Sequence, residues 1–190
     1  MGIIKTKKGN VYGNRVVTGE VKVFWAAVDE PEQPGKFSKG GEYKVVFGIR
    51  KGTNYDSIKQ AVLDTAKEAF GSNASFSTIY LPFQDGAKKK DETMADYVIV
   101  SAKSTRKPQV IDADGMTFAG PVYRGSTVKV SLVPMSYESP QVQHGRGITF
   151  KLGNVQVIEN AAYSGPSAAE EFGVYQGSSE VKLEENDLPF

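Results

Sequence analysis

The chain has 190 residues with 23 Lys and Arg, 22 Asp and Glu, one His and no Cys, so its formal net charge is +1. Without Cys it has no disulfide, zinc-thiolate site or cysteine nucleophile. No stretch reaches the ~18–20 apolar residues of a membrane span, and the N-terminus lacks the apolar core of a secretory signal. We therefore expect a cytosolic protein of one domain plus a tail.

The charge is unevenly distributed along the chain. Residues 168–190 hold six acidic residues and one lysine, a net charge of −5, so residues 1–167 carry +6. A basic body with an acidic tail is typical of nucleic-acid binding or of an interaction tail. We expect residues 180–190 to be a disordered acidic interaction tail, because they have little apolar surface to bury. A frayed, solvated terminus is the alternative.

The first half of the chain begins with a basic segment and two strands. Residues 1–15 are basic and broken by glycines, and they suit either a DNA-contacting arm or a solvated leader. Residues 16–28 are rich in β-branched and aromatic residues and predict a long strand, in which Gly19 marks either a bulge or a bend. A loop with two prolines and three glycines follows at 29–41, and a second strand is predicted at 42–51.

One helix is predicted after the second strand, at residues 54–71. Apolar side chains recur at i, i+3, i+4 and i+7 from Ile58 onward. Asn54 or Asp56 can cap the N-terminus of the helix, and Gly71 is a natural stop. We expect the apolar stripe of this helix to pack on the sheet.

Three further strands follow an irregular segment. Residues 72–93 lack a regular pattern and contain three consecutive lysines, 88–90, which suit either a solvated loop or a phosphate contact. Strands are predicted at 97–104, 125–137 and 145–159. Together with the two earlier strands, these make five long strands.

Five curling strands and one helix predict a mainly β fold, an OB-fold-like five-stranded barrel with one α-helix and a disordered acidic C-terminal tail. The usual OB helix lies between the third and fourth strands, whereas this one follows the second. Either the long first strand counts as two or the connectivity differs. We divide the chain into a basic N-terminal arm (1–15), an OB-fold domain (16–160), a flexible linker (161–179) and the acidic tail (180–190).

The sequence gives little support to an enzyme. The single His144 lies in a loop, where a lone His is far more often solvated than catalytic. The chain contains no His or Cys cluster, no G-x-x-x-x-G-K-[ST] loop and no G-x-S-x-G elbow. We expect no catalytic residues, no metal and no cofactor.

Single-stranded DNA (ssDNA) binding requires cations that follow the phosphates and flat rings on which bases stack. A strand aromatic in phase with Val and Ile belongs to the core, which places Phe150 there, whereas one in phase with Lys or Arg can be a platform. Tyr123 and Tyr137 lie at strand ends near charge and suit a platform, and Trp25 is ambiguous. The residues that we predict to bind DNA are Trp25, Tyr43, Arg50, Lys103, Arg106, Lys107, Tyr123, Arg124, Lys129, Tyr137, Arg146 and Lys151.

Two sets of motifs resemble known protein families. The tip Asp187-Leu188-Pro189-Phe190, after its acidic run, resembles the tail tip of bacterial single-stranded DNA-binding proteins (SSBs). Roughly residues 15–172 resemble a tailed-phage family of SSBs with an OB fold. The stretches that carry this resemblance are LPFQDG at 81–86, SAKSTRKP at 101–108, FAGPVYRG at 118–125 and GITFKLGNVQ at 147–156.

The resemblance implies a sequence-independent ssDNA-binding protein of phage DNA replication or recombination, acting in the host cytoplasm. It implies a tail that occupies the DNA groove when DNA is absent and recruits partner proteins through Asp187, Leu188, Pro189 and Phe190. An RNA-binding OB protein and a non-enzymatic structural or interaction phage protein with a docking tail are the alternatives. Self-association through an exposed sheet edge is a further expectation left open.

Overall fold

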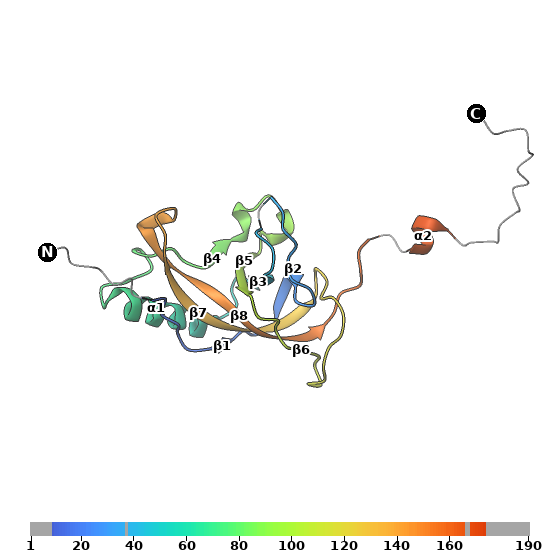
Figure 1. Cartoon of the computed structure of the whole chain (residues 1–190), viewed down its shortest axis with the longest axis horizontal. Coiled ribbons are helices and arrows are strands. Elements are labelled where there is room, and N and C mark those ends of the chain that lie inside the picture. Colours follow the sequence, from blue (N-terminus) through green and yellow to red (C-terminus); the bar gives the residue numbers. More distant parts are fainter. Residues whose placement is uncertain (1–8, 37, 166–167, 174–190) are drawn as a thin grey trace, which may run out of the picture.

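The computed structural model describes residues 9–36, 38–165 and 168–173, and most of them form a β-rich body with one long helix (Figure 1). The predicted acidic tail, with its partner-binding residues Asp187 to Phe190, lies outside the described residues, as do residues 1–8 of the predicted arm and parts of the predicted linker.

Eight strands are present in the described part of the chain. Three are short and were not predicted as separate strands: β1 (Val16–Val17), β4 (Phe83–Asp85) and β6 (Val110–Ile111). The five long strands confirm the five predicted ones. They are β2 (Val21–Ala27), β3 (Tyr43–Arg50), β5 (Tyr97–Ser104), β7 (Thr127–Glu138) and β8 (Arg146–Glu159). Of the two alternatives for Gly19, a bulge or a bend, the structure shows a bend, which separates β1 from β2.

The predicted helix is α1 (Asp56–Phe70), and its ends follow from local chemistry. Asn54 accepts a hydrogen bond from the Asp56 N–H at 2.8 Å, and the Gly71 N–H donates to the Lys67 carbonyl. Gly71 has a φ of 100°, a conformation that glycine adopts without strain. The buried face of α1 packs against β1, β7 and β8. A second helix, α2 (Ala168–Phe172), is one short turn.

The long strands pair mostly in an antiparallel manner. β3 lies between β2 and β5, and β7 and β8 form a long antiparallel pair. β5 and β8 are parallel, with Ala102 opposite Phe150. β7 also pairs with β2, through Val21 opposite Val128, and with β1. Strands far apart in the sequence therefore lie next to each other.

The core contains the inward half of each long strand and one stripe of α1. Phe47, Leu132 and Phe150 are fully buried, which confirms Phe150 as a core residue. Successive side chains of a strand point to opposite faces, so the residues between these core positions point outward. This alternation places the charged residues described below on the surface.

Residues 9–15, the described part of the predicted arm, lie against β7. The Gly13 N–H donates to the Pro134 carbonyl, and the Ser136 N–H donates to the Val11 carbonyl, both at 2.8 Å. A Cβ on Gly13 would come within 1.9 Å of Thr65 Oγ1 on α1. The contact between this segment and the body therefore requires glycine at that position.

Candidate nucleic-acid interface

A row of three lysines crosses the outward face of β3, β5 and β8. Lys44 lies opposite Lys103 in the β3–β5 register, and Lys103 lies opposite Lys151 in the β5–β8 register. Ala102 and Phe150, which precede two of these lysines, are fully buried, so the lysines point outward. Neighbouring strands are about 4.8 Å apart, so the row spans roughly 10 Å across the sheet. We call these residues the lysine row.

The lysine row ends at a cleft of about 930 Å³. Its walls come from the segment before β1, the end of β5, and the middle of β7 and β8. Among the described residues that line it, none is acidic, and four are cations: Arg15, Arg106, Lys107 and Lys151. Lys107 also lies 3.4 Å from Asp29, an exposed pair. We call this space the basic cleft.

An exposed ring and a glycine shape the basic cleft. The Tyr12 side chain is 53% exposed, and Lys151 Nζ lies 5.7 Å from the centre of its ring. Arg15 donates to the Ser131 hydroxyl at 3.0 Å. A Cβ on Gly153 would come within 2.1 Å of that hydroxyl and 2.8 Å of Arg15 Nη1. Gly153 thus leaves the space in which the Arg15 guanidinium lies.

A second hollow, of about 350 Å³, also contains Lys103 and brings two tyrosines together. Tyr80 and Tyr137 line it with Ser101 and Thr149. Burial raises the pKa of Tyr137, and the neighbouring Tyr80 adds to this shift. The Tyr137 ring is therefore an uncharged phenol at neutral pH. Such a ring can stack on a base without repelling a phosphate.

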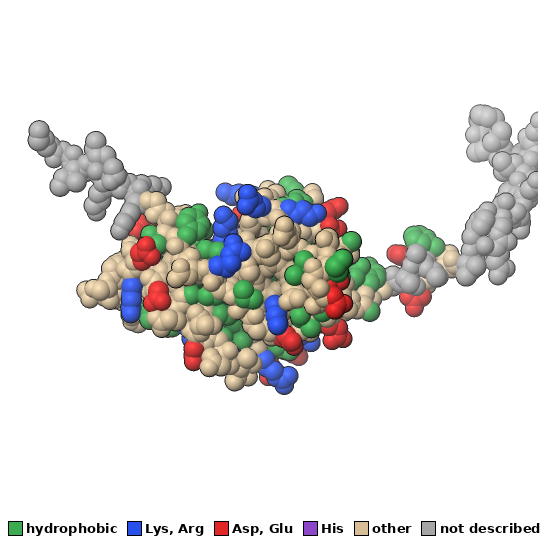
Figure 2. Space-filling view, turned by 90° about the horizontal axis from the view of Figure 1, so that it is seen from below, with side chains coloured by type: hydrophobic (Ala, Val, Ile, Leu, Met, Phe, Trp, Pro, Cys, Tyr) green, Lys and Arg blue, Asp and Glu red, His purple; other side chains and the backbone are tan. Residues whose placement is uncertain are grey.

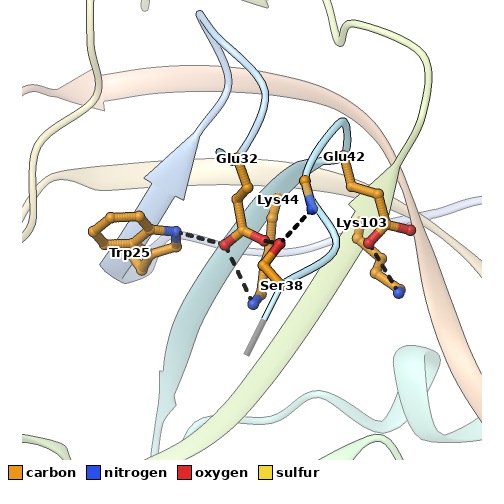
Figure 3. Close-up of polar contacts among 7 residues, drawn as sticks. Trp25, Glu32, Ser38, Glu42, Lys44 and Lys103 are labelled. Carbon is orange, nitrogen blue, oxygen red and sulfur yellow. Dashed lines mark hydrogen bonds and ion pairs between the residues drawn. The ribbon is translucent and has the colours of Figure 1, made fainter. Parts of the chain in front are cut away.

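The far end of the lysine row lies beside Trp25 (Figure 3). The Trp25 side chain is 55% exposed, which settles its ambiguous assignment in favour of the surface. Two acids of the β2–β3 loop lie over this end, with Glu32 3.4 Å from Lys44 and Glu42 3.1 Å from Lys103. The row is thus partly covered at the Trp25 end and open at the basic cleft.

Positive charge gathers on one part of the surface. In Figure 2, Lys and Arg side chains cluster at the upper centre of the view, whereas most Asp and Glu side chains lie toward its left and right sides. A phosphate chain that follows the cluster would lie near several cations at once, because screened Coulomb interactions act mainly within about 10 Å.

The structure brings together about half of the predicted DNA-binding residues. Arg106, Lys107 and Lys151 line the basic cleft, and Lys103 joins it to the hollow that contains Tyr137. The predicted set of DNA-binding residues leaves out four residues that complete this arrangement, two of which belong to the segment 1–15 that suits either a DNA-contacting arm or a solvated leader. They are Tyr12, Arg15, Lys44 and Tyr80. Alternation along β3 could have identified Lys44, but its position opposite Lys103 depends on strand pairing.

Two predicted arginines make contacts within the body instead of lining the basic cleft. Arg124 donates to Asp91 at 2.5 Å, and its guanidinium lies 5.4 Å from the centre of the buried Phe24 ring. Arg146 donates to the Thr78 carbonyl and lies 5.1 Å from the Phe70 ring. Both cations therefore connect loops to the core.

The remaining predicted residues are spread over other parts of the body. Tyr43 packs partly buried against the core, and Arg50 is the exposed last residue of β3. Tyr123 contacts the Tyr163 ring at 5.7 Å. Lys129 lines a small hollow of about 140 Å³ beside Val17. None of these four lines the basic cleft or the Tyr80–Tyr137 hollow.

The residues that the structure describes include neither a candidate metal site nor a candidate membrane-spanning helix. No group of three or more His, Cys, Asp or Glu side chains among them is arranged to hold a metal ion. No helix within the described ranges is long and apolar enough to cross a membrane.

The fold is that of phage ssDNA-binding proteins of known structure. A structure titled single-stranded DNA-binding protein from bacteriophage Enc34 in complex with ssDNA matches with a TM-score of 0.61 and 18% identity, over 80% of this chain and 89% of that one. The T7 protein gp2.5, titled a single-stranded DNA binding protein, matches with a TM-score of 0.59 and 16% identity, over 87% of this chain and 97% of that one. At these identities the likeness shows the fold alone.

A family model described as Enterobacter phage Enc34, ssDNA-binding protein, matches residues 14–184. The chain therefore belongs to the family of the Enc34 ssDNA-binding protein. A search of curated proteins found no match.

Proposed function

We propose that this protein binds ssDNA without sequence preference. The observation that carries the proposal is the lysine row that leads into the basic cleft, with the exposed rings of Trp25 and Tyr12 at its two ends. Membership of the Enc34 family supports it. Cations would follow the phosphates, and base stacking on the rings would add about 1–3 kcal/mol per base. Neither interaction depends on base identity.

For the body we propose an OB-type barrel. The pairings β2–β3, β3–β5, β5–β8 and β8–β7 lead back to β2, because β7 pairs with β2 as well. The parallel β5–β8 pair supports this topology. The helix α1 follows the second strand of the proposed barrel, so the connectivity departs from the usual OB form on this point.

The acidic tail is proposed to compete with DNA for the same surface. Residues 180–190 hold four acidic residues and one lysine, a net charge of −3 that is opposite in sign to the basic cleft, and tethering keeps them at high effective concentration. Bound DNA would displace the tail and free its tip, residues 187–190, for a replication or recombination protein. We propose that this non-enzymatic cycle operates in phage DNA replication or recombination, in the host cytoplasm.

DNA contact by the other predicted residues stays a prediction. These residues are Tyr43, Arg50, Tyr123, Arg124, Lys129 and Arg146. The proposal rests on the lysine row, the basic cleft and the rings beside them. The domain limits at 15, 160 and 179 are proposals of the same kind.

Fluorescence anisotropy of labelled oligo-dT tests both parts of the proposal. The full chain and a chain that ends at Ser179 are titrated at two salt concentrations, with a DNA duplex and oligo-rU as controls. We expect binding to oligo-dT that weakens with salt through counterion release and tightens on truncation, most at low salt. Unchanged affinity after truncation would rule out tail competition. No salt-dependent binding by either chain would favour a structural phage protein with a docking tail.

A further inference from the structure

Trp25 is the one tryptophan in the chain, and its ring is more than half exposed. An exposed aromatic side chain ordinarily rotates about two torsions. The Trp25 indole N–H, however, donates a hydrogen bond to Glu32 Oε1 at 3.1 Å. The ring is therefore held at its polar edge while more than half of the Trp25 surface stays exposed to solvent.

Glu32 is itself held from several directions (Figure 3). Its side chain is only 12% exposed, Oε2 accepts a hydrogen bond from the Ser38 hydroxyl at 3.0 Å, and Oε1 lies 3.4 Å from Lys44 Nζ. Its backbone N–H donates to the Glu42 carbonyl, and its carbonyl accepts from the Gly41 N–H. The carboxylate therefore has a defined position relative to β2 and β3.

A carboxylate at this position has an electrostatic cost for the proposed function. It lies beside Lys44, at the end of the lysine row, where it would repel a phosphate. A residue that served only to neutralise Lys44 would weaken DNA binding. Orientation of the neighbouring ring offsets this cost, because a ring fixed before binding loses less conformational freedom when a base stacks on it.

We propose that Glu32 is a positioning residue that holds the Trp25 ring in one orientation as a stacking platform for a nucleobase. The inference rests on the proposed ssDNA binding and deepens it. Fixing one side chain is worth about three- to tenfold in affinity. Glu32 acts through Trp25 and does not itself contact DNA.

Two substitutions of Glu32 separate positioning from charge. Glu32→Gln keeps a side-chain oxygen that can accept the indole N–H, but it removes the negative charge. Glu32→Ala removes both. If Glu32 positions Trp25, we expect Glu32→Ala to bind oligo-dT about three- to tenfold more weakly and Glu32→Gln to bind at least as tightly as the wild type. If both variants bind more tightly to the same degree, Glu32 only covers Lys44 and the inference is wrong.

Trp25 emission gives a readout that charge alone would not change. As the single tryptophan, it reports on the ring directly. We expect Glu32→Ala to lower the emission anisotropy of the free protein and to reduce the quenching caused by saturating oligo-dT, and Glu32→Gln to restore both. Ser38→Ala, which removes one support of Glu32, is a milder variant with the same expected direction. Unchanged anisotropy in both Glu32→Ala and Ser38→Ala would contradict the inference.

A double-mutant cycle tests whether Glu32 acts through Trp25. Trp25→Phe keeps a ring but removes the N–H that Glu32 accepts. In the Trp25→Phe background, Glu32→Ala should not weaken oligo-dT binding further, and an undiminished loss would overturn the inference. Oligo-dT binding by the wild type without any change in Trp25 emission would overturn the inference and leave the proposed function intact. No oligo-dT binding at all would overturn both.

Discussion

Arg106 and Arg124 are residues of the same type, and both precede a strand that reaches the surface, yet their surroundings differ. Arg106 lines a cleft in which no described residue is acidic. Arg124 donates to Asp91 and Thr93 and lies over the Phe24 ring. The first cation is available to a phosphate, and the second fastens two loops to the core. A cation's contribution to DNA binding therefore depends on its neighbours rather than on its charge.

The largest expected effect comes from removing charge in the basic cleft. In the double variant Arg106→Ala/Lys151→Ala, two lost phosphate contacts should reduce the slope of log K against log salt by about 1.4. At 0.1 M salt this corresponds to a loss of affinity on the order of 25-fold. Lys59→Ala/Lys67→Ala on α1 is a control with the same change in net charge. Equal losses of affinity in the two double variants would mean that the basic cleft contributes to DNA binding only through the net charge of the protein.

Gly153→Ala tests the shape of the basic cleft. The added methyl group would collide with Ser131 and displace the Arg15 guanidinium. Overpacking of this kind costs about 1–3 kcal/mol, so Tm should fall by about 2–12 °C in a chain of this size. Gly9→Ala is the matched control, since nothing lies within 4 Å of its added Cβ. Equal Tm values for Gly153→Ala and the wild type would contradict this account.

Arg124→Ala should affect stability more than DNA binding. The lost cation–π contact with Phe24 is worth about 0.5–1 kcal/mol, so Tm should fall by about 1–4 °C. The salt slope for oligo-dT should stay at the wild-type value, as measured by anisotropy titrations. A slope that falls by about 0.7 is expected for the loss of one phosphate contact. That result would mean that Arg124 contacts DNA, as we expect for Arg106.

The smallest effect concerns Asp91 and acid. Hydrogen bonds from the Thr93 hydroxyl and from Arg124 hold the pKa of Asp91 below its ordinary value of 3.8. A lowered folded-state pKa adds stability that is fully present above pH 3.8 and is lost as pH falls through the folded pKa. Asp91→Asn should therefore lower Tm slightly at pH 7, and the difference from the wild type should shrink in acid. A Tm difference that grows in acid would mean that folding raises the pKa of Asp91 instead of lowering it.

The long elements were predictable because their periods are regular. Apolar alternation marks β3, β5, β7 and β8, and a 3.6-residue stripe marks α1. β4 and β6 were not predicted because strands of two or three residues show no period.

Much of the candidate site could not be predicted, because it depends on register and on backbone contacts. Val21, Val23 and Trp25 share one phase, which would place Trp25 in the core. The register shifts between Val23 and Trp25, so Phe24 is buried and the Trp25 ring is exposed. Similarly, Tyr12 reaches the cleft because its backbone pairs with Met135, a contact that no side-chain pattern encodes.

The parallel pairing of β5 with β8 has a consequence for the order of folding. β7 and β8 are joined by a short connection, residues 139–145, so their hairpin closes a small loop and can form early. The pairing of Lys103 with Lys151 joins strands that are separated by β6 and the whole of β7. Its cost in loop-closure entropy is therefore larger than that of the β7–β8 hairpin. We expect the lysine row to be among the last features to assemble, so that a partly folded chain presents its lysines singly and a DNA strand meets the complete row only on the finished molecule.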